Sequence, residues 1–529
     1  MKGKLKNRTQ NMSAKNSLIA GNWEEGKGDS FASYNPANQE KLADYKGVNT
    51  AQIDAAVQAA SKAFSIFKSI DFDARAQFID DVASEIEALG DELLETCNNE
   101  TGLGIPRITG ERGRTCGQLR AFADLVRKGS WQQARIDTAL PNRTPLPKPD
   151  IRSVLRPLGP VAVFSASNFP LAFATLGGDT ASALASGNPV VVKGHPSHPG
   201  TSALCAKAIE RAIEKNNLPK GLFSLVQGGS PSVSSDLVKH PKIEAVGFTG
   251  STYVGRILFD LGASRPKPIP VFAEMGSSNP LFVLPKAIKN RGSEIANGLA
   301  GSITLGTGQF CTKPGLVFLL KSENAKVFKD ELKKAIQAIQ IGNFLNARIK
   351  SSLDAKLHEF TTKDNLSVIA GGTANEGTLL TISGSEFIRN PDLEDEMFGP
   401  AALIIECENI EELLNAAKQL GGHLTGTLHS DDDAEAVLLK EILEEKVGRI
   451  VYNGFPTGVE VCPSMHHSGP YPSSTSSQTT SVGTSAITRF CTVGCYQNAP
   501  QEHLPEALKD KNSRGIMRLV NGEYTTQNV

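Results

Sequence analysis

The sequence lacks the features that would direct it to a membrane, to nucleic acid or to a structural metal. Nowhere does it contain the roughly 20 consecutive apolar residues of a transmembrane helix. Its 55 Lys and Arg balance 56 Asp and Glu, so neither nucleic acid nor a membrane surface is expected as a partner. None of the eight cysteines forms a CxxC pair, and we therefore expect no metal site.

The cysteines and the N-terminal residues also indicate in which cellular compartment the protein is found. Scattered cysteines in a long chain are typical of reduced thiols, which predicts a cytoplasmic protein. The segment 1–17 is basic and has no apolar core, so it does not resemble a secretory signal. We expect it to be a disordered tail, because such a segment cannot bury apolar area.

Length and pattern predict several α/β domains. A chain of 529 residues exceeds the roughly 250–300 residues at which single cores stop growing. Helical periodicity over 50–88 precedes an alternation of apolar strands and helices, which predicts a parallel, doubly wound sheet. A second α/β region begins near Asn279. The predicted strands of the first region are VAVFSA (161–166), NPVVVKG (188–194), LFSLVQG (222–228) and IEAVGFTGS (243–251).

The compositions of two stretches disfavour helices and strands. Residues 139–150 are rich in proline and must be extended or looped. Residues 473–486, SSTSSQTTSVGTSA, are almost entirely small and hydroxyl-bearing. From composition alone this second stretch is interpreted as a flexible linker.

Two residues could carry covalent and acid–base chemistry. Cys311 lies in a glycine-bearing turn between a helical stretch and a strand, where a thiol can be exposed and reactive. Glu274 stands alone among apolar residues and precedes a glycine, a setting that suits a general base. Taken singly, each has an ordinary alternative: most cysteines are inert buried thiols, and most glutamates are solvated or cap a helix.

Three further positions follow predicted strands, at the sheet edge where ligands bind. The Asn168 amide could donate to a developing oxyanion, although an ordinary Asn turn is the simpler interpretation. Lys193 ends a strand and could face a ligand or extend along the surface. Gly250, Ser251 and Gly255 form a glycine turn that could bring backbone N–H groups to a phosphate, or could simply connect strand to helix.

Together and in this order, six segments resemble the aldehyde dehydrogenase superfamily. They are SNFP (167–170), VVVKG (190–194), GFTGSTYVG (247–255), AEMGSSNP (273–280), GQFCTKPG (308–315) and EMFGP (396–400). The resemblance implies an α/β fold with a Rossmann-type NAD(P)-binding domain over 18–139 and 158–275. It also implies an α/β catalytic domain over 276–480 and a β oligomerisation arm from 140–157 and 481–529. On this basis residues 473–486 belong to the folded C-terminal region.

The resemblance assigns roles to named residues. The Cys311 thiolate would attack the aldehyde, the Asn168 amide and the Cys311 N–H would hold the oxyanion, and Glu274 would activate water to release the acid. Lys193 and Glu396 would bind cofactor ribose hydroxyls. Phe398 would pack beside the nicotinamide, and the turn containing Gly250, Ser251 and Gly255 would meet the pyrophosphate.

Finer features resemble one subgroup, the α-ketoglutaric semialdehyde (2,5-dioxovalerate) dehydrogenases. They are KGHPSHPGTS (193–202), PIPVFAEMGSSNP (268–280) and the segment from 456 to 490. This implies oxidation of that semialdehyde to α-ketoglutarate, with a medium- or long-chain fatty aldehyde as the alternative substrate. A homodimer or homotetramer is expected from the family.

Cofactor choice and substrate recognition are predicted from single positions. Pro196 stands where NAD-preferring relatives carry a glutamate, and Gly229–Pro231 lacks the arginine of NADP-preferring ones, so either NAD or NADP is expected to serve. Arg114 and Gln118 share one helix face, where Arg114 could bind the far carboxylate of the substrate. The alternative is a surface Arg114 paired with Glu111.

Two functions of other classes are alternatives. A cysteine hydrolase would need a histidine paired with Cys311, and no acyl-hydrolase motif surrounds His466 or His467. A non-catalytic nucleotide-binding protein would have no need for Cys311, Glu274 and Asn168 together.

Overall fold

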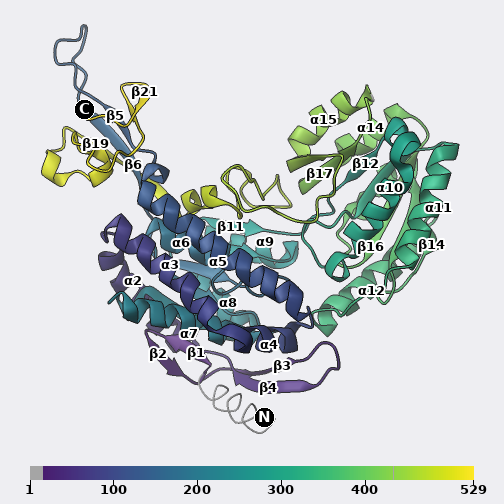
Figure 1. Ribbon diagram of the computed structural model, residues 1–529, viewed down its shortest axis with the longest axis horizontal. Coiled ribbons are helices and arrows are strands. Elements are labelled where there is room, and N and C mark those ends of the chain that lie inside the picture. The colour runs from purple at the N-terminus through teal and green to yellow at the C-terminus, as the bar shows by residue number, and fades with distance from the viewer. Residues whose placement is uncertain (1–15, 433) are drawn as a thin grey trace.

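Three β-sheets organise the chain in a computed structural model that describes residues 16–432 and 434–529 (Figure 1). The first sheet has seven strands in the order β11-β10-β7-β8-β9-β1-β2. The pairs from β11 to β9 are parallel, as the strand–helix alternation predicts, while β1 and β2 are antiparallel additions. The strands are β1 (Ser17–Ile19), β2 (Asn22–Glu24), β7 (Val161–Phe164), β8 (Val190–Lys193), β9 (Phe223–Val226), β10 (Ala245–Thr249) and β11 (Val271–Glu274).

Helices cover this sheet because each has one apolar face that must be buried. Asn49 caps the first of them by accepting a hydrogen bond from the Gln52 N–H at 3.0 Å. The helices are α2 (Thr50–Phe67), α3 (Phe72–Ala88), α4 (Gly90–Thr101), α5 (Ile105–Lys128), α6 (Gly178–Ser186), α7 (Pro199–Lys215), α8 (Pro231–Lys239) and α9 (Thr252–Ala263). A separate hairpin of β3 (Ser30–Tyr34) and β4 (Lys41–Lys46) flanks them.

The second sheet, also of seven strands, has the order β14-β15-β16-β13-β12-β17-β18. All its pairs are parallel except β14–β15. Its strands are β12 (Leu281–Val283), β13 (Leu316–Leu320), β14 (Ser367–Ala370), β15 (Thr378–Ser383), β16 (Ala401–Cys407), β17 (His423–His429) and β18 (Val447–Tyr452). Its helices are α10 (Pro285–Thr304), α11 (Glu323–Gln337), α12 (Ala347–Thr361), α13 (Gly384–Arg389), α14 (Ile410–Gln419) and α15 (Glu435–Lys446).

A third sheet of five strands projects from the first α/β layer and carries the C-terminus (Figure 1). Its order is β19-β6-β5-β20-β21, which joins strands from the middle and the end of the chain. The strands are β5 (Arg135–Asp137), β6 (Ile151–Pro157), β19 (Cys491–Gln497), β20 (Arg518–Val520) and β21 (Glu523–Thr525). We call this sheet the arm.

The interpretation of residues 473–486 as a flexible linker is wrong. The Met275 N–H donates to the carbonyl oxygen of Ser473 at 2.8 Å. The Thr475 hydroxyl accepts from the Ala273 N–H at 2.9 Å and donates to the Val271 carbonyl at 2.6 Å. Short hydroxyl side chains thus hydrogen-bond to the edge of β11, an ordered role that composition cannot distinguish from disorder.

Two other expectations concern the N-terminal segment and membrane-spanning helices. Of the tail predicted over 1–17, residues 1–15 lie outside the described residues, and Ser17 begins β1. Within the described part of the chain, no helix has the length and apolar character needed to cross a membrane.

Candidate active site

The carboxyl ends of the first sheet bring several predicted residues to one edge. Lys193 ends β8 and Glu274 ends β11, while Gly250 follows β10 directly. The Gly250 N–H donates to the Glu274 carbonyl oxygen at 3.1 Å, which fixes the glycine turn against β11. This is the edge at which open α/β sheets bind their ligands.

Cys311 lies in a tight turn between α10 and β13 of the second sheet. Gly308 has φ +64°, and a Cβ on it would collide with the backbone of Gly399. Only glycine therefore fits, and the turn is held against the segment that carries Glu396 and Phe398. The carboxamide oxygen of Gln309 also accepts from the Leu345 N–H at 3.0 Å.

Two asparagine side chains support the Cys311 turn from opposite sides. The buried Asn279 amide donates to the carbonyl oxygens of Cys311 and Lys313 at 2.8 and 2.9 Å. The Asn168 amide donates to the carbonyl of Gln309 at 3.1 Å, so the structure places Asn168 beside the nucleophile turn. Asn279 belongs to the segment AEMGSSNP but was not singled out by sequence reasoning.

The Cys311 sulfur lies within a cluster of three reactive side chains. His467 Nε2 is 3.4 Å from Cys311 Sγ and 3.3 Å from Glu274 Oε2. Atoms of all three side chains lie within 4.8 Å of one another. Glu274 and His467 are buried, whereas Cys311 remains partly exposed. Among the described residues, Glu274 Oε2 accepts no hydrogen bond.

The surroundings of Cys311 disfavour its thiolate in the free enzyme. Burial raises the pKa of the Cys311 thiol well above its ordinary value, and the charges of Glu274 and Glu396 raise it further. Arg114 acts in the opposite direction but is a smaller influence. A proton acceptor within reach of the sulfur is therefore needed near neutral pH, and the His467 ring nitrogen has that position.

Residues of both sheets meet at the start of α9. Ser251 caps this helix by accepting from the Val254 N–H at 3.4 Å. A Cβ on Gly255 would lie 2.6 Å from the Met275 sulfur, which explains why glycine stands there. Glu396 Oε2 lies 2.5 Å, and the Thr252 hydroxyl of α9 3.0 Å, from the position that a Cβ on Gly276 would occupy. Gly250, Ser251, Gly255 and Glu396 are thus brought together.

Three charged side chains belong to these segments: Lys313 is buried, and Lys193 and Glu396 are half-buried. Burial lowers the pKa of Lys193 to about 8. Burial also raises the pKa of Glu396 to about 7, an effect that the charge of Lys313 opposes. The Lys313 ammonium donates to the carbonyls of Met397 and Ala401 at 2.9 and 2.7 Å. It therefore holds the segment around Glu396 and the half-buried Phe398 against the Cys311 turn.

Arg114 is not paired with Glu111 at the surface, so that alternative is wrong. The Glu111 carboxylate instead accepts from the N–H groups of Leu171 and Ala172 at 2.8 and 2.9 Å. The Arg114 guanidinium packs over the rings of Phe169 and Phe173, 5.9 and 5.3 Å from their centroids. Its Nε and Nη2 are buried and have no hydrogen-bond partner among the described residues.

The environment of Arg114 connects it to the cluster around the sulfur. Burial lowers the pKa of the Arg114 guanidinium, and the charges of Glu111 and Cys311 partly restore it. The Phe173 ring, which Arg114 covers, lies 6.2 Å from the His467 ring. Gln118 is also buried on α5, but its side-chain nitrogen lies against Gly178 at the start of α6.

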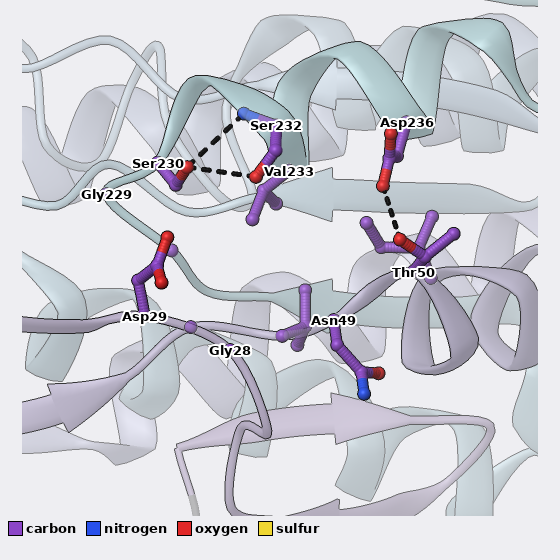
Figure 2. A pocket seen from close by; sticks show the side chains of 13 residues that line it. Gly28, Asp29, Asn49, Thr50, Gly229, Ser230, Ser232, Val233 and Asp236 are labelled. Carbon is purple, nitrogen blue, oxygen red and sulfur yellow. Dashed lines mark hydrogen bonds between the residues drawn. The ribbon is translucent and has the colours of Figure 1, made fainter.

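A separate cavity of about 210 Å³ lies at the start of α8 (Figure 2). Gly229 and Ser230, which belong to the stretch expected to influence cofactor choice, line it. The carboxylates of Asp29 and Asp236 also line it, and among the described residues no basic one does; Thr50 donates to Asp236 at 2.6 Å. None of the predicted catalytic residues contributes to this cavity.

His467 is the residue that sequence reasoning missed at the site. It lies 156 positions from Cys311, so no local spacing connects the two. The only signal in the sequence is the pair His466–His467, which would serve a cysteine hydrolase but has no acyl-hydrolase motif around it. The structure brings His467 to Cys311, within a site that also contains Glu274 and adjoins the turn before α9.

Comparison with known proteins places this geometry in a family. Residues 23–493 match the model of the aldehyde dehydrogenase family. The chain is 42% identical over 516 residues to an α-ketoglutaric semialdehyde dehydrogenase 2 from Azospirillum brasilense, covering 96% of this chain and 98% of the relative. It is 45% identical over 487 residues to an α-ketoglutaric semialdehyde dehydrogenase from Acinetobacter baylyi, covering 90% and 91%.

Solved structures share the fold at lower identity. HpcC from Thermus thermophilus aligns with a TM-score of 0.80 at 21% identity, covering 95% of this chain and 96% of that one. Lactaldehyde dehydrogenase from Escherichia coli aligns with a TM-score of 0.80 at 20% identity, covering 92% and 99%. The predicted fold class is thereby confirmed, and the chain belongs to the aldehyde dehydrogenase family.

Proposed function

We propose that this enzyme oxidises α-ketoglutaric semialdehyde to α-ketoglutarate, with NAD or NADP as cofactor and a thioester on Cys311 as intermediate. One observation carries the proposal: His467 Nε2 lies 3.4 Å from the Cys311 sulfur and 3.3 Å from Glu274 Oε2, and Glu396 meets the start of α9 at Gly276, two residues after Glu274. The names of the relatives from Azospirillum brasilense and Acinetobacter baylyi support the choice of substrate.

Thioester formation begins when Cys311 loses its proton. His467 Nε2, at 3.4 Å, is placed to accept it, because the buried thiol needs a nearby base. The sulfur then attacks the aldehyde carbon, and the oxyanion is held by the Asn168 amide and the Cys311 N–H. Asn168 uses one amide hydrogen on Gln309 and retains a second for this role.

A dinucleotide would bind along the start of α9. Backbone N–H groups at the start of α9 suit a pyrophosphate, and Glu396 at Gly276 and Lys193 at the end of β8 suit ribose hydroxyls. Phe398 would pack beside the nicotinamide, which, when bound, supplies the acceptor for the substrate's hydride. The close contact of Gly255 with Met275 keeps the helix near the sheet, as a phosphate site at this turn requires.

Thioester hydrolysis depends on Glu274. Its Oε2 is buried and accepts no hydrogen bond among the described residues, so it is available to a water molecule. Removing a proton from that water directs hydroxide at the thioester carbon, and the acid leaves as Cys311 regains its proton. His467, 3.3 Å from Glu274, can then pass on the proton it holds.

The far carboxylate of the substrate would bind Arg114. Its guanidinium has two buried nitrogen atoms, Nε and Nη2, with no hydrogen-bond partner among the described residues, and a carboxylate accepts from such a fork in two places. A fatty aldehyde would leave those N–H groups unpaired, at a cost of about 1–3 kcal/mol each, which disfavours that alternative. Gln118 would help to position Arg114 along α5.

Neither cofactor should be strongly excluded. Pro196 carries no charge to repel a 2′-phosphate, and the start of α8 at Gly229 and Ser230 offers that phosphate no cation. We expect the kcat/KM values for NAD and NADP to differ by less than about a thousandfold, ~4 kcal/mol. A larger ratio would exclude dual use.

One assay separates the proposed function from its rivals. The enzyme is mixed with NAD or NADP and a panel of aldehydes, and absorbance is followed at the band of reduced nicotinamide. We expect the semialdehyde acid to give the highest kcat/KM. A hydrolase or a non-catalytic binding protein would give no absorbance change with any aldehyde, and preference for long neutral aldehydes would contradict the role of Arg114.

The organisation of the chain follows from the same proposal. The cofactor-binding domain comprises 18–139 and 158–275, the catalytic domain 276–480, and the oligomerisation region 140–157 and 481–529. We expect a homodimer or homotetramer built through the arm, acting in the cytoplasm. Size-exclusion chromatography with light scattering would measure the assembly.

A further inference from the structure

Glu274, Cys311 and His467 form a set of donors that suits a metal ion as well as an aldehyde. They offer a carboxylate oxygen, a sulfur and a ring nitrogen, all within 4.8 Å of one another. These are the three donor types that Zn²⁺ accepts in proteins. We propose that this cluster binds a thiophilic divalent cation, Zn²⁺ above others, and that the bound cation reversibly blocks the enzyme.

The separations agree with a tetrahedral ion. Zinc bonds of ~2.0–2.3 Å at tetrahedral angles hold a sulfur and a nitrogen roughly 3.6 Å apart, and a nitrogen and an oxygen roughly 3.3 Å apart. The corresponding distances here are 3.4 Å from Cys311 Sγ to His467 Nε2 and 3.3 Å from His467 Nε2 to Glu274 Oε2. His467 Nε2 therefore lies at a suitable distance from both other donors, while the Cys311 sulfur and the Glu274 carboxylate, within 4.8 Å of each other, would close around the ion.

One of the donor atoms lacks a hydrogen bond. Glu274 Oε2 is buried and accepts none from a described residue, although His467 Nε2 lies 3.3 Å away, and an unsatisfied buried oxygen is costly. His467 is 1% exposed and Glu274 is 4% exposed, whereas Cys311 is partly open. An ion can thus reach the cluster by the route that an aldehyde must take to the sulfur.

Charge favours a dication. A Cys311 thiolate and a Glu274 carboxylate bring two negative charges and His467 brings none when neutral, so a Zn²⁺ complex is balanced. Glu396 adds a further carboxylate nearby, while Arg114 is the opposing cation. Three protein ligands leave a fourth position open to water, as in zinc sites that exchange ligands.

Binding changes the state of each catalytic group without any oxidation or reduction. The sulfur–hydrogen bond of Cys311 breaks, a sulfur–zinc bond forms, and one proton passes to solvent. The sulfur lone pair is then unavailable to an aldehyde, and Glu274 cannot accept a proton from water. Inhibition follows from occupation of the same atoms that catalysis uses.

The test uses cobalt as a spectroscopic substitute for zinc. Full-length, chelator-treated protein is titrated with Co²⁺ in the absence of aldehyde. We expect one ion per chain, a sulfur-to-cobalt charge-transfer band, release of about one proton, and displacement by Zn²⁺. In parallel, Zn²⁺ should inhibit turnover, and EDTA should restore it.

Matched variants locate the ion. His467→Gln should weaken Co²⁺ binding by about 100-fold or more and Cys311→Ser should abolish the band, since each removes a ligand. His466→Gln, the neighbouring histidine outside the cluster, and Cys495→Ser, an exposed cysteine of the arm, should bind as the unaltered protein does.

Two results would overturn the proposal: absence of a sulfur-to-cobalt band in the unaltered protein, or unchanged affinity in His467→Gln. Thermal melting checks that each variant is folded. If His467→Gln is not, Glu274→Gln removes a different ligand and replaces it in the comparison. Because the cobalt spectrum does not depend on turnover, an error in the proposed dehydrogenase activity would leave this test intact.

Discussion

Two arginines, a half-buried one near the active site and a buried one in the arm, differ in how their charge is paired. Arg152 in β6 donates to both carboxylate oxygens of Asp150 at 2.8 and 3.0 Å and to the Leu508 carbonyl at 2.6 Å. It also contacts Asp510 at 2.7 Å. Arg114 in α5 packs over two aromatic rings, and two of its nitrogen atoms lack hydrogen-bond partners among the described residues.

The electrostatic consequences run in opposite directions. The Asp150 and Asp510 carboxylates raise the pKa of Arg152, while burial lowers the pKa of Arg114, an effect that the charges of Glu111, Cys311 and Glu460 only partly offset. In the arm, Arg152 therefore forms its ion pairs with carboxylates of the same chain. Near the active site, Arg114 has no such ion pair among the described residues and would form one only with a bound anionic ligand.

The largest effect expected on the active-site side of this comparison comes from Cys311→Ala. Turnover should fall by at least about 10⁴-fold, because the covalent partner of the aldehyde is gone. Affinity for NAD or NADP, measured by calorimetry, should be unchanged, since the cofactor contacts lie elsewhere. Substantial remaining turnover would contradict the role of Cys311.

Glu274→Gln should separate the two halves of the reaction. We expect a burst of about one reduced cofactor per active site, followed by turnover slower by about 10²–10⁴-fold, because only hydrolysis of the thioester needs a base for water. Stopped-flow absorbance measures both phases. Loss of the burst would mean that Glu274 acts earlier, on the Cys311 thiol.

Arg114→Met tests the unsatisfied charge directly. Activity on the semialdehyde acid should fall by about 10²-fold or more, ~3 kcal/mol, while a neutral aldehyde of equal length is barely affected. The measurement is kcat/KM on both substrates. Equal losses on the two would indicate a structural role for Arg114, and the comparison with the arm would then fail.

Arg152→Met is the matched change in the arm and should have the smallest effect on chemistry. We expect a loss of about 2 kcal/mol in the free energy of unfolding, since Asp150 and Asp510 are partly exposed and can be solvated. The kcat on the semialdehyde acid should stay the same below the melting temperature. A selective loss on the acid, without destabilisation, would contradict the contrast between the two arginines.

Much of the fold could be predicted because its signals are local. Apolar β-branched runs ending in glycine indicated the parallel strands β7 to β10, and helical periodicity indicated α2 and α3. Cys311, Glu274 and Asn168 could be selected because each lies in a short segment typical of the family. The structure places all three at one site, although their individual roles stay predictions.

What could not be predicted depends on contacts between distant segments. No spacing rule connects His467 to Cys311 across 156 positions, and rules for zinc sites likewise search for ligand pairs close in sequence. The absence of an ion pair between Arg114 and Glu111 could not be predicted for a similar reason. Glu111 is its neighbour on α5, but the backbone N–H groups of Leu171 and Ala172 occupy that carboxylate.

The hydroxyl-rich stretch after His467 has a consequence for protein engineering. The Ser473 carbonyl accepts from the Met275 N–H, just after β11, and the Thr475 hydroxyl accepts from Ala273 and donates to Val271 within the strand that ends in Glu274. A designer choosing an insertion point for a fluorescent reporter by composition would select this stretch as the most permissive. An insertion there would pull His467 away from the Cys311 sulfur. We therefore expect it to abolish activity, although the composition of the stretch suggests a permissive site.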